Sequence, residues 1–385
     1  METSAHKYKI VYCTPGLYMA GGMERVLTLK ANYFADTLGY DVTIILTEGE
    51  GMPYFYPLSD NVNVINLNIG FETLWNKSIL QKVFIYLRKQ RQYKKALRNC
   101  LMQIRPEITV SMLRREINFL NSIHDGSKKI GEIHINRANY RTFEKGDSNL
   151  FKSLLSRYWK RSLVGHLKKL DRFVTLTEKD REAWTELSNV CVIPNPVSFP
   201  SVKLSQQTEK RVIVVGRYCH EKGYDDLLTI WASVQYRCPD WRLDVYGDGD
   251  RSAYELLVDK CQIDRSRCSL NGRVSDVQSE FARSSLAVCS SRFEGFGLAI
   301  VEAMACGLPV VSFDCPWGPR SIITDGEDGV LVENGNLEQF AIAMVKLMQD
   351  GDARAEMGRR AVVNVQRFSM DSVARQWTDL FNSLH

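Results

Sequence analysis

Short runs rich in β-branched residues alternate with helical patterns along the whole chain, and they form two series. In the first half the runs are Tyr8 to Cys13, Val42 to Thr47, Asn63 to Leu67, Ile108 to Met112 and Phe173 to Leu176. In the second half they are Arg211 to Val215, Arg242 to Tyr246, Ser269 to Asn271, Leu286 to Ser290, Pro309 to Phe313 and Val330 to Val332. Strands that alternate with helices form parallel sheets, so the pattern predicts two doubly wound α/β domains.

A proline-rich break separates the two series. Pro194 and Pro196 interrupt the chain, and no helical period follows them up to Glu209. We therefore expect an N-terminal domain over residues 1–196 and a second domain over 197–366. Residues 367–385 are expected to form a helix that packs back toward the first domain. Apolar residues recur there at helical spacing, at Val373, Trp377, Leu380 and Phe381.

The composition is that of an ordinary globular protein, with 44% hydrophobic and 25% charged residues, which excludes disordered and collagen-like chains. No apolar run approaches the ~18 residues of a membrane span. The first apolar segment, Ile10 to Tyr12, is too short for a signal peptide. Ten cysteines occur without a CxxC pair, so we expect neither a disulfide framework nor a zinc site, and a cytoplasmic location.

Residues 290–309 carry the pattern richest in chemistry. A strand is followed by two glycines and then by a helix that Gly307 and Pro309 end. The free amides of Phe296, Gly297 and Leu298 are expected at the N-terminus of this helix, after a parallel strand. An α/β sheet binds anions at that position, so a phosphate group would fit there.

Two carboxylates flank the start of the same helix. Glu294 precedes it, and Glu302 lies about one turn inside it. Carboxylates repel a diphosphate but accept hydrogen bonds from neutral hydroxyl groups, which sugars supply. In the alternative interpretation, Glu294 only interacts with the helix dipole and Glu302 is a solvated surface residue.

A second cluster follows the strand that ends at Val215. Gly216 and Arg217 come directly after it, and Lys222 follows five residues later. Two cations beside a helix N-terminus would stabilise the charge of a departing diphosphate without a metal ion. Alternatively, both are ordinary surface charges. Residues 248–250 (Asp-Gly-Asp) offer a possible metal site, but their place after a strand favours a glycine-rich turn.

At these residues the sequence resembles the retaining glycosyltransferase family 4, which has the GT-B fold. The resemblance covers nearly all of 211–332. Its elements are Gly216-Arg217, Lys222-Gly223, Gly247-Asp248-Gly249, Leu270-Asn271-Gly272, Glu294-x7-Glu302, Asp314 to Pro319 and Asp325 to Gly329. The resemblance implies two Rossmann-like domains, with doubly wound parallel sheets, that face a central cleft.

The resemblance also implies roles for individual residues. Arg217 and Lys222 would clamp the donor diphosphate, and Glu302 would bind the ribose hydroxyls. Glu294 and the amides after it would face the donor sugar and phosphates, together with Gly295, Phe296, Gly297 and Leu298. The nucleotide base would lie near the segment formed by Gly272, Arg273 and Val274.

The N-terminal half matches the family more loosely. Gly21 and Gly22 follow the first strand, as does the glycine loop that in the family approaches the diphosphate and the acceptor. A structural turn before a helix is the alternative. His134 lies near the end of an expected strand, where the family often places a histidine against the donor sugar, and Glu132 and Arg137 are less certain neighbours.

Basic residues are concentrated in the first half. Residues 1–195 contain 29 Lys and Arg against 19 Asp and Glu, or +10, and 196–385 contain 21 against 26, or −5. No acid lies between Glu72 and Glu107, where nine basic residues occur, and a second basic stretch runs from Lys152 to Lys169. The first stretch suggests either a pair of interfacial helices drawn to anionic lipid, or two domain helices with solvated charges. No nucleic-acid-binding module is present.

Together these features predict a hexosyltransferase. It would move a hexose or N-acetylhexosamine from a nucleotide sugar, most simply a UDP-sugar, to a glycan or a polyprenyl-diphosphate-linked glycan in polysaccharide biosynthesis. No cofactor or metal is expected, and contact with the inner face of the plasma membrane is. The alternatives are a GT-B-like UDP-sugar 2-epimerase or hydrolase, and a noncatalytic sugar-binding subunit.

Overall fold

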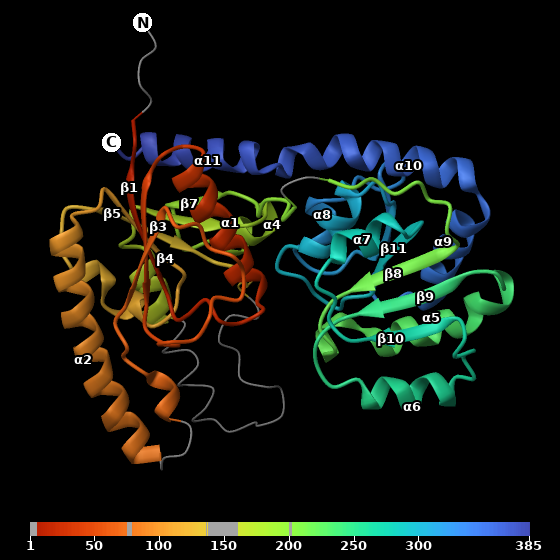
Figure 1. Cartoon of the computed structure of the whole chain (residues 1–385), viewed down its shortest axis with the longest axis horizontal. Coiled ribbons are helices and arrows are strands. Elements are labelled where there is room, and N and C mark those ends of the chain that lie inside the picture. The colour runs from red at the N-terminus through yellow and green to blue at the C-terminus, as the bar shows by residue number, and fades with distance from the viewer. Residues whose placement is uncertain (1–5, 75–78, 136, 138–160, 200–201) are drawn as a thin grey trace, which may run out of the picture. The chain divides into compact units, whose positions relative to one another are not determined.

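A computed structural model describes residues 6–74, 79–135, 137, 161–199 and 202–385 (Figure 1). It divides into two compact units, Met1–Pro194 with Val373–His385, and Asn195–Ser372. The sequence placed these limits at 196/197 and 366/367. In the described ranges, no helix has both the length and the apolar character that a membrane span requires.

The first unit contains a parallel sheet in the order β3-β2-β1-β4-β5-β6-β7. Its strands are β1 (Lys9–Thr14), β2 (Asp41–Leu46), β3 (Val62–Asn66), β4 (Ile108–Ser111), β5 (Lys128–Glu132), β6 (Arg172–Thr175) and β7 (Val190–Val192). The five runs predicted in this half correspond to β1 to β4 and β6. The sequence pattern missed β7, because a half-buried edge strand of three residues shows no periodicity.

Four helices of the first unit are α1 (Gly22–Asp36), α2 (Ile79–Ile104), α4 (Glu178–Ala183) and α11 (Met370–Asn382). Helix α2 packs on β1 and β2 through three buried residues, Tyr93, Leu97 and Leu101. Helix α11 packs on α1, and the Phe381 and Phe34 ring centroids lie 6.1 Å apart.

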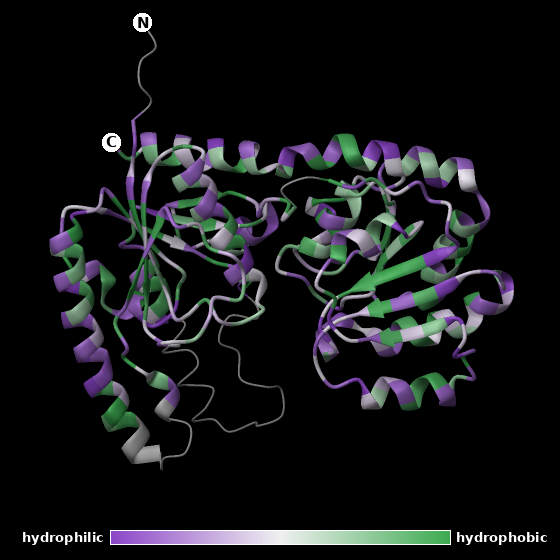
Figure 2. Ribbon diagram, in the orientation of Figure 1, coloured by the Kyte–Doolittle hydropathy of each residue, from purple (hydrophilic) through white to green (hydrophobic). Residues whose placement is uncertain are grey.

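The prediction of a helix pair in the acid-free segment was wrong. Residues 79–104 form one continuous helix, because no glycine or proline interrupts them. Its polar and apolar residues alternate in patches along its length (Figure 2). Of the second basic stretch, residues 152–160 lie outside the described ranges, whereas residues 161–167 are helical and bury Leu163 and Leu167.

The second unit contains a parallel sheet in the order β10-β9-β8-β11-β12-β13. Its strands are β8 (Arg211–Val215), β9 (Arg242–Tyr246), β10 (Cys268–Asn271), β11 (Leu286–Cys289), β12 (Val310–Phe313) and β13 (Gly329–Val332). Its helices are α5 (Tyr224–Arg237), α6 (Ser252–Lys260), α7 (Val277–Ala282), α8 (Leu298–Ala305), α9 (Leu337–Gln349) and α10 (Gly351–Asn364). The six strands agree with the six runs predicted for this half.

Both sheets have the strand order of a Rossmann-like domain. In the second unit the order reverses between β8 and β11, whose alternate residues enter one apolar core with α5 and α9. In the first unit it reverses between β1 and β4. Ligands of doubly wound sheets bind outside the carboxyl ends of the strands at such a reversal. The loops after β8 and β11 therefore flank the expected ligand position in the second unit.

Candidate active site

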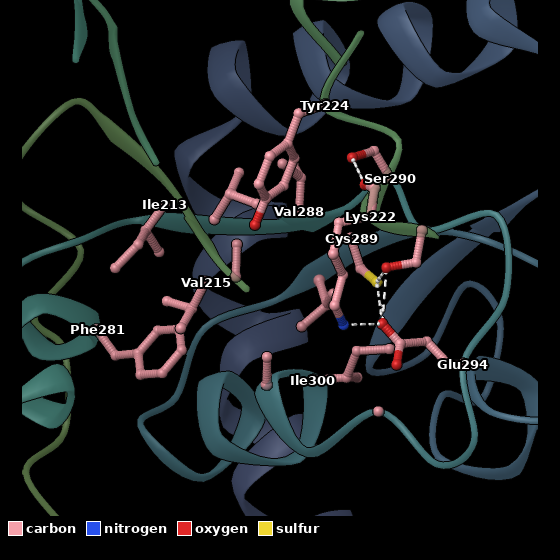
Figure 3. Close-up of a pocket in the computed structure, with 16 residues that line it drawn as sticks. Ile213, Val215, Lys222, Tyr224, Phe281, Val288, Cys289, Ser290, Glu294 and Ile300 are labelled. Atoms are coloured by element: carbon pink, nitrogen blue, oxygen red, sulfur yellow. Dashed lines mark hydrogen bonds and ion pairs between the residues drawn. The ribbon is translucent and has the colours of Figure 1, made fainter. Parts of the chain in front are cut away.

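The loops at the reversal in the second unit bring Lys222 and Glu294 together. Lys222 ends a 3-10 turn, η4 (His220–Lys222), after β8, and Glu294 lies in the loop between β11 and α8. The Lys222 Nζ donates a hydrogen bond to Glu294 Oε1 at 2.6 Å (Figure 3). Their side chains are 22% and 14% exposed, so the ion pair is largely withdrawn from water.

The Glu294 carboxylate has further partners on its own loop. The Ser291 hydroxyl donates to the same Oε1 at 2.7 Å, and the Cys289 Sγ lies 3.9 Å from it. Burial by itself lowers the pKa of Lys222, but the negative charge of Glu294 reverses this effect and raises the pKa above its usual value. Burial also raises the pKa of the Cys289 thiol, so this cysteine stays protonated. The pair therefore carries one fixed positive and one fixed negative charge.

Gly223 holds the two loops against each other. Its φ is +61°, and a Cβ there would come within 2.2 Å of the Ser290 carbonyl oxygen. The Ser290 hydroxyl in turn donates to the Lys222 carbonyl at 2.8 Å. Only glycine satisfies both conditions without strain, so the Lys222 backbone is set by direct contact with the loop that carries Glu294.

The helix α8 begins at Leu298 as the sequence predicted. Gly297, at its N-cap, has a φ of +108° and carries no side chain that could accept from the amides of the first turn. These amides and the helix dipole make the position suitable for an anion. Phe296 is buried, and Gly295 lies in the loop beside Glu294.

Glu302 is buried, with 2% of its surface exposed, so the interpretation of a solvated surface residue was wrong. It lies on the inward face of α8, and the Ser198 hydroxyl donates to its Oε1. Sequence reasoning missed Ser198, because a serine in a linker carries no signal of the side chain that it will meet. The contact brings the start of the second unit against the second conserved-type carboxylate position of the predicted motif.

Other predicted residues lie on neighbouring loops. Arg217 directly follows Gly216 and is exposed, and within the described ranges its guanidinium forms no ion pair with the Glu294 carboxylate. Gly272, Arg273 and Val274 follow β10 at the same carboxyl edge of the sheet. The structure thus places these groups on one edge but directly joins only Lys222 and Glu294.

Asp248 and Asp250 belong to a tight turn after β9. The Asp248 carboxylate accepts from the Gly249 amide at 2.9 Å, and that of Asp250 accepts from the Ser252 amide at 2.9 Å. Gly249 has a φ of +115°. Both carboxylates therefore act on the local backbone, as the interpretation of a glycine-rich turn predicted.

A small cavity lies beside the ion pair and is lined by Lys222, Cys289, Ser291, Glu294 and Ile300 (Figure 3). Its volume of about 20 Å³ is enough for one water molecule. A nucleotide sugar is far larger, so such a ligand would bind over the ion pair rather than inside this cavity.

In the first unit Gly21 and Gly22 lie at the start of α1, with Gly21 as the N-cap. His134 follows β5 by two residues, and its Nε2 lies 3.1 Å from Glu132 Oε1. Burial raises the pKa of Glu132, but the charge of Lys30 and the contact with His134 outweigh it and lower the pKa to about 2. Glu132 is therefore a direct neighbour of His134.

Arg137 is engaged elsewhere. Its two terminal nitrogens each lie 2.6 Å from a carboxylate oxygen of Glu186, and its guanidinium stacks on the Trp184 ring at 4.9 Å. Its amide donates to Asp180 at 3.0 Å. The arginine thus ties the segment after β5 to the region of α4, and not to His134.

Comparison with known proteins agrees with this geometry. Residues 209–350 match the family model of glycosyl transferases group 1. The chain is 26% identical to an uncharacterized glycosyltransferase of Haemophilus influenzae, covering 96% of this chain and 98% of that protein. It is also 26% identical to the poly(ribitol-phosphate) α-N-acetylglucosaminyltransferase of Staphylococcus aureus, covering 88% of this chain but only 66% of that relative.

Solved structures show the same architecture. TarM of S. aureus, in complex with fondaparinux, α-GlcNAc-glycerol and UDP, superposes with a TM-score of 0.77 at 18% identity, covering 98% of this chain and 100% of that one. Sucrose-phosphate synthase from Thermosynechococcus elongatus superposes with a TM-score of 0.79 at 17% identity, covering 98% and 99%. The chain therefore has the GT-B fold, and its second unit carries a domain of the glycosyl transferases group 1 family.

Proposed function

We propose that this chain is a retaining glycosyltransferase of family 4 that uses a UDP-sugar and glycosylates a glycan or a lipid-linked glycan. The observation that carries the proposal is the Lys222–Glu294 pair beside the N-terminus of α8, at the reversal of the second sheet. The position offers a cation and free amides to a diphosphate, and a carboxylate to sugar hydroxyls. A UDP complex of TarM and a Staphylococcus aureus relative named as an α-N-acetylglucosaminyltransferase support the donor class.

In this proposal the diphosphate lies over Lys222 and the first-turn amides of α8, while Arg217 contacts it from the solvent side. Glu294 accepts hydrogen bonds from the sugar, and Glu302 accepts them from the ribose. Lys222 needs no protonation step, because Glu294 already keeps its pKa high. The two cations and the helix dipole stabilise the negative charge that develops as the bond between the sugar and the diphosphate breaks.

The transfer itself exchanges one bond for another at the anomeric carbon. The acceptor hydroxyl oxygen bonds to this carbon on the face from which the diphosphate departs, and a diphosphate oxygen takes the hydroxyl proton. This step needs no enzyme nucleophile and keeps the anomeric configuration. The charge stabilisation by Lys222 and Arg217 makes a metal ion dispensable, so the proposed reaction proceeds in the presence of a chelator.

We also propose that helix α2 contacts an anionic membrane surface on the cytoplasmic side. Val83, Phe84 and Leu87 are 53%, 71% and 50% exposed, although they are large apolar residues. The next turns of the helix expose five basic residues, Arg88, Arg91, Lys94, Lys95 and Arg98. Apolar side chains beside basic ones are the pattern of a helix that lies in a membrane interface. A lipid-linked acceptor would be reached from that surface.

Product analysis tests the proposed function. The protein is incubated with UDP-glucose, UDP-galactose or UDP-N-acetylglucosamine, with and without a glycan acceptor, and UDP release and the anomeric NMR signal are followed. We expect UDP release to require the acceptor and the product to be the α-anomer. A β-anomer would refute retention. Rapid consumption of donor without acceptor would instead indicate an epimerase or hydrolase.

A further inference from the structure

A buried cluster of charged residues adjoins His134 in the first unit. Lys30 of α1 donates a hydrogen bond to Glu132 Oε1 at the end of β5, and the two side chains are 1% and 2% exposed. The same oxygen lies 3.1 Å from the Nε2 of His134, whose side chain is 8% exposed. One carboxylate oxygen therefore contacts an ammonium group and an imidazole ring at once.

Aromatic rings from two further elements enclose the lysine. Its Nζ lies 4.3 Å from the ring centroid of Trp377 on α11 and 5.7 Å from that of Tyr12 on β1. Both rings are fully buried. Lysine is almost never buried without a partner, since an isolated charge away from water is very costly. Lys30 and Glu132 are therefore held as an ion pair, and Glu132 is ionised.

An ionised Glu132 determines which ring nitrogen of His134 carries the proton. A carboxylate only accepts hydrogen bonds, so the nitrogen that faces it must be a donor. In neutral histidine one ring nitrogen is a donor and the other an acceptor. With the hydrogen on Nε2 toward Glu132, the Nδ1 lone pair is left as the acceptor.

We propose that Glu132 is a positioning residue that fixes His134 as the Nε2–H tautomer, so that Nδ1 accepts a hydrogen bond from a hydroxyl group of the sugar substrate. The inference rests on the proposed function, in which His134 contacts sugar. It deepens that function, because an Nδ1 acceptor selects a neutral hydroxyl and rejects an anionic oxygen. Lys30 and Trp377 act through Glu132, so the C-terminal helix contributes to the order of this site.

A second buried ion pair in the same sheet provides a matched control. Lys129, also in β5, pairs with Asp125, and their side chains are 8% and 0% exposed. Its Nζ also bonds to the Ser127 hydroxyl at 2.5 Å. Neither residue is bonded to His134 in the described ranges. The loss of this pair therefore shows what the loss of any buried ion pair does to the first unit.

The experiment compares three double variants with the wild type. K30M/E132M removes the charge pair together with the acceptor, K30M/E132Q removes the charges but keeps a neutral acceptor, and K129M/D125N removes the control pair. Each double variant removes both charges, because one unpaired buried charge destabilises a fold far more than the loss of a pair. The readouts are the ¹⁵N NMR signals of His134, assigned with H134N, and the kcat for transfer.

We expect a single Nε2–H tautomer in the wild type, in K30M/E132Q and in K129M/D125N. K30M/E132M should show a mixture of tautomers, and its kcat should fall about 10- to 100-fold relative to K30M/E132Q, as is typical when a residue that orients a functional histidine is lost. The affinity for UDP, measured by calorimetry, should not change, because Glu132 lies outside the second unit.

Three outcomes would overturn the inference. The first is an Nδ1–H tautomer in the wild type, a measurement that needs no variant to fold. The second is an unchanged tautomer in K30M/E132M. The third is an equal loss of kcat in K30M/E132M and K129M/D125N, which would show that the pair has only a structural role. Full activity of H134A is a separate result, since it would refute the proposed role of His134 itself.

Discussion

The Lys222 Nζ and the Glu294 Oε1 lie 2.6 Å apart, although 72 positions separate them in the chain. The two residues follow strands β8 and β11, which are neighbours at the point where the strand order of the second sheet reverses. A ligand that binds there meets a cation and an anion that are already oriented by each other. The predictions below begin with this pair.

Replacement of Lys222 by alanine should reduce kcat for transfer about 100- to 1000-fold, the usual effect of losing one group that stabilises charge in the transition state. Lys210→Ala is the control, since Lys210 is equally basic but forms its ion pair with Asp240 on the exposed surface. The measurement is UDP release under saturating donor and acceptor. Equal activities of the two variants would contradict the proposed role.

Replacement of Ser198 by alanine should weaken UDP binding and lower stability by about 1–3 kcal/mol, because the buried Glu302 loses a hydrogen-bond donor. Calorimetry with UDP and chemical unfolding measure the two effects. Ser266→Ala is the control, because the Ser266 hydroxyl bonds to Asp264 on the surface. If Ser198→Ala binds UDP as the control does, Ser198 does not orient Glu302 for the ribose.

Replacement of Gly223 by alanine should be more destabilising than replacement of Gly326. Both have positive φ, +61° and +77°, so alanine brings strain of about 1–3 kcal/mol at either position. Only at Gly223 does the new Cβ meet a carbonyl oxygen, that of Ser290, and overpacking adds about 1–3 kcal/mol there. Urea unfolding of both variants measures the difference. Equal losses would mean that the loop moves freely away from Gly223.

The stability of the first unit should depend on acid through Glu132. Its pKa in the folded state is about 2, below the value of 4.5 for an ordinary glutamate. A carboxyl with a lowered pKa stabilises the fold above pH 4.5, and this stabilisation is lost as the pH falls from there toward 2. Urea unfolding at pH 6 and pH 3 should therefore show a larger decrease for the wild type than for K30M/E132M. Parallel decreases would show that Glu132 is not the group involved.

Serine at both Phe84 and Leu87 should reduce binding to anionic liposomes, because the helix loses the apolar residues that would enter the interface. Flotation at low and high salt measures the binding, and high salt should weaken it because the basic residues act through charge. Met102→Ser is the control, since Met102 is 49% exposed on the same helix but lies near its other end. No binding of the wild type at low salt would refute membrane contact.

Much of the fold and of the donor-side site was predictable because the evidence is local. The six strands of the second unit follow apolar runs, and the start of α8 follows from Gly297 and the strand before it. The topology of a parallel sheet then requires that the loops after its strands share one edge. The choice of Lys222 and Glu294 as functional residues therefore needed only their positions after two strands.

The sequence by itself determined the two series of strands and helices, the glycines at positive φ, and the identity of the charged groups at the strand ends. Only the tertiary structure decided that Lys222 pairs with Glu294, that Ser198 meets Glu302, and that Lys30 enters the first unit's core beside Glu132 and Trp377. The physical reason is that backbone conformation depends on neighbours in the chain, whereas a side chain's partner and burial depend on elements that packing brings together from distant positions.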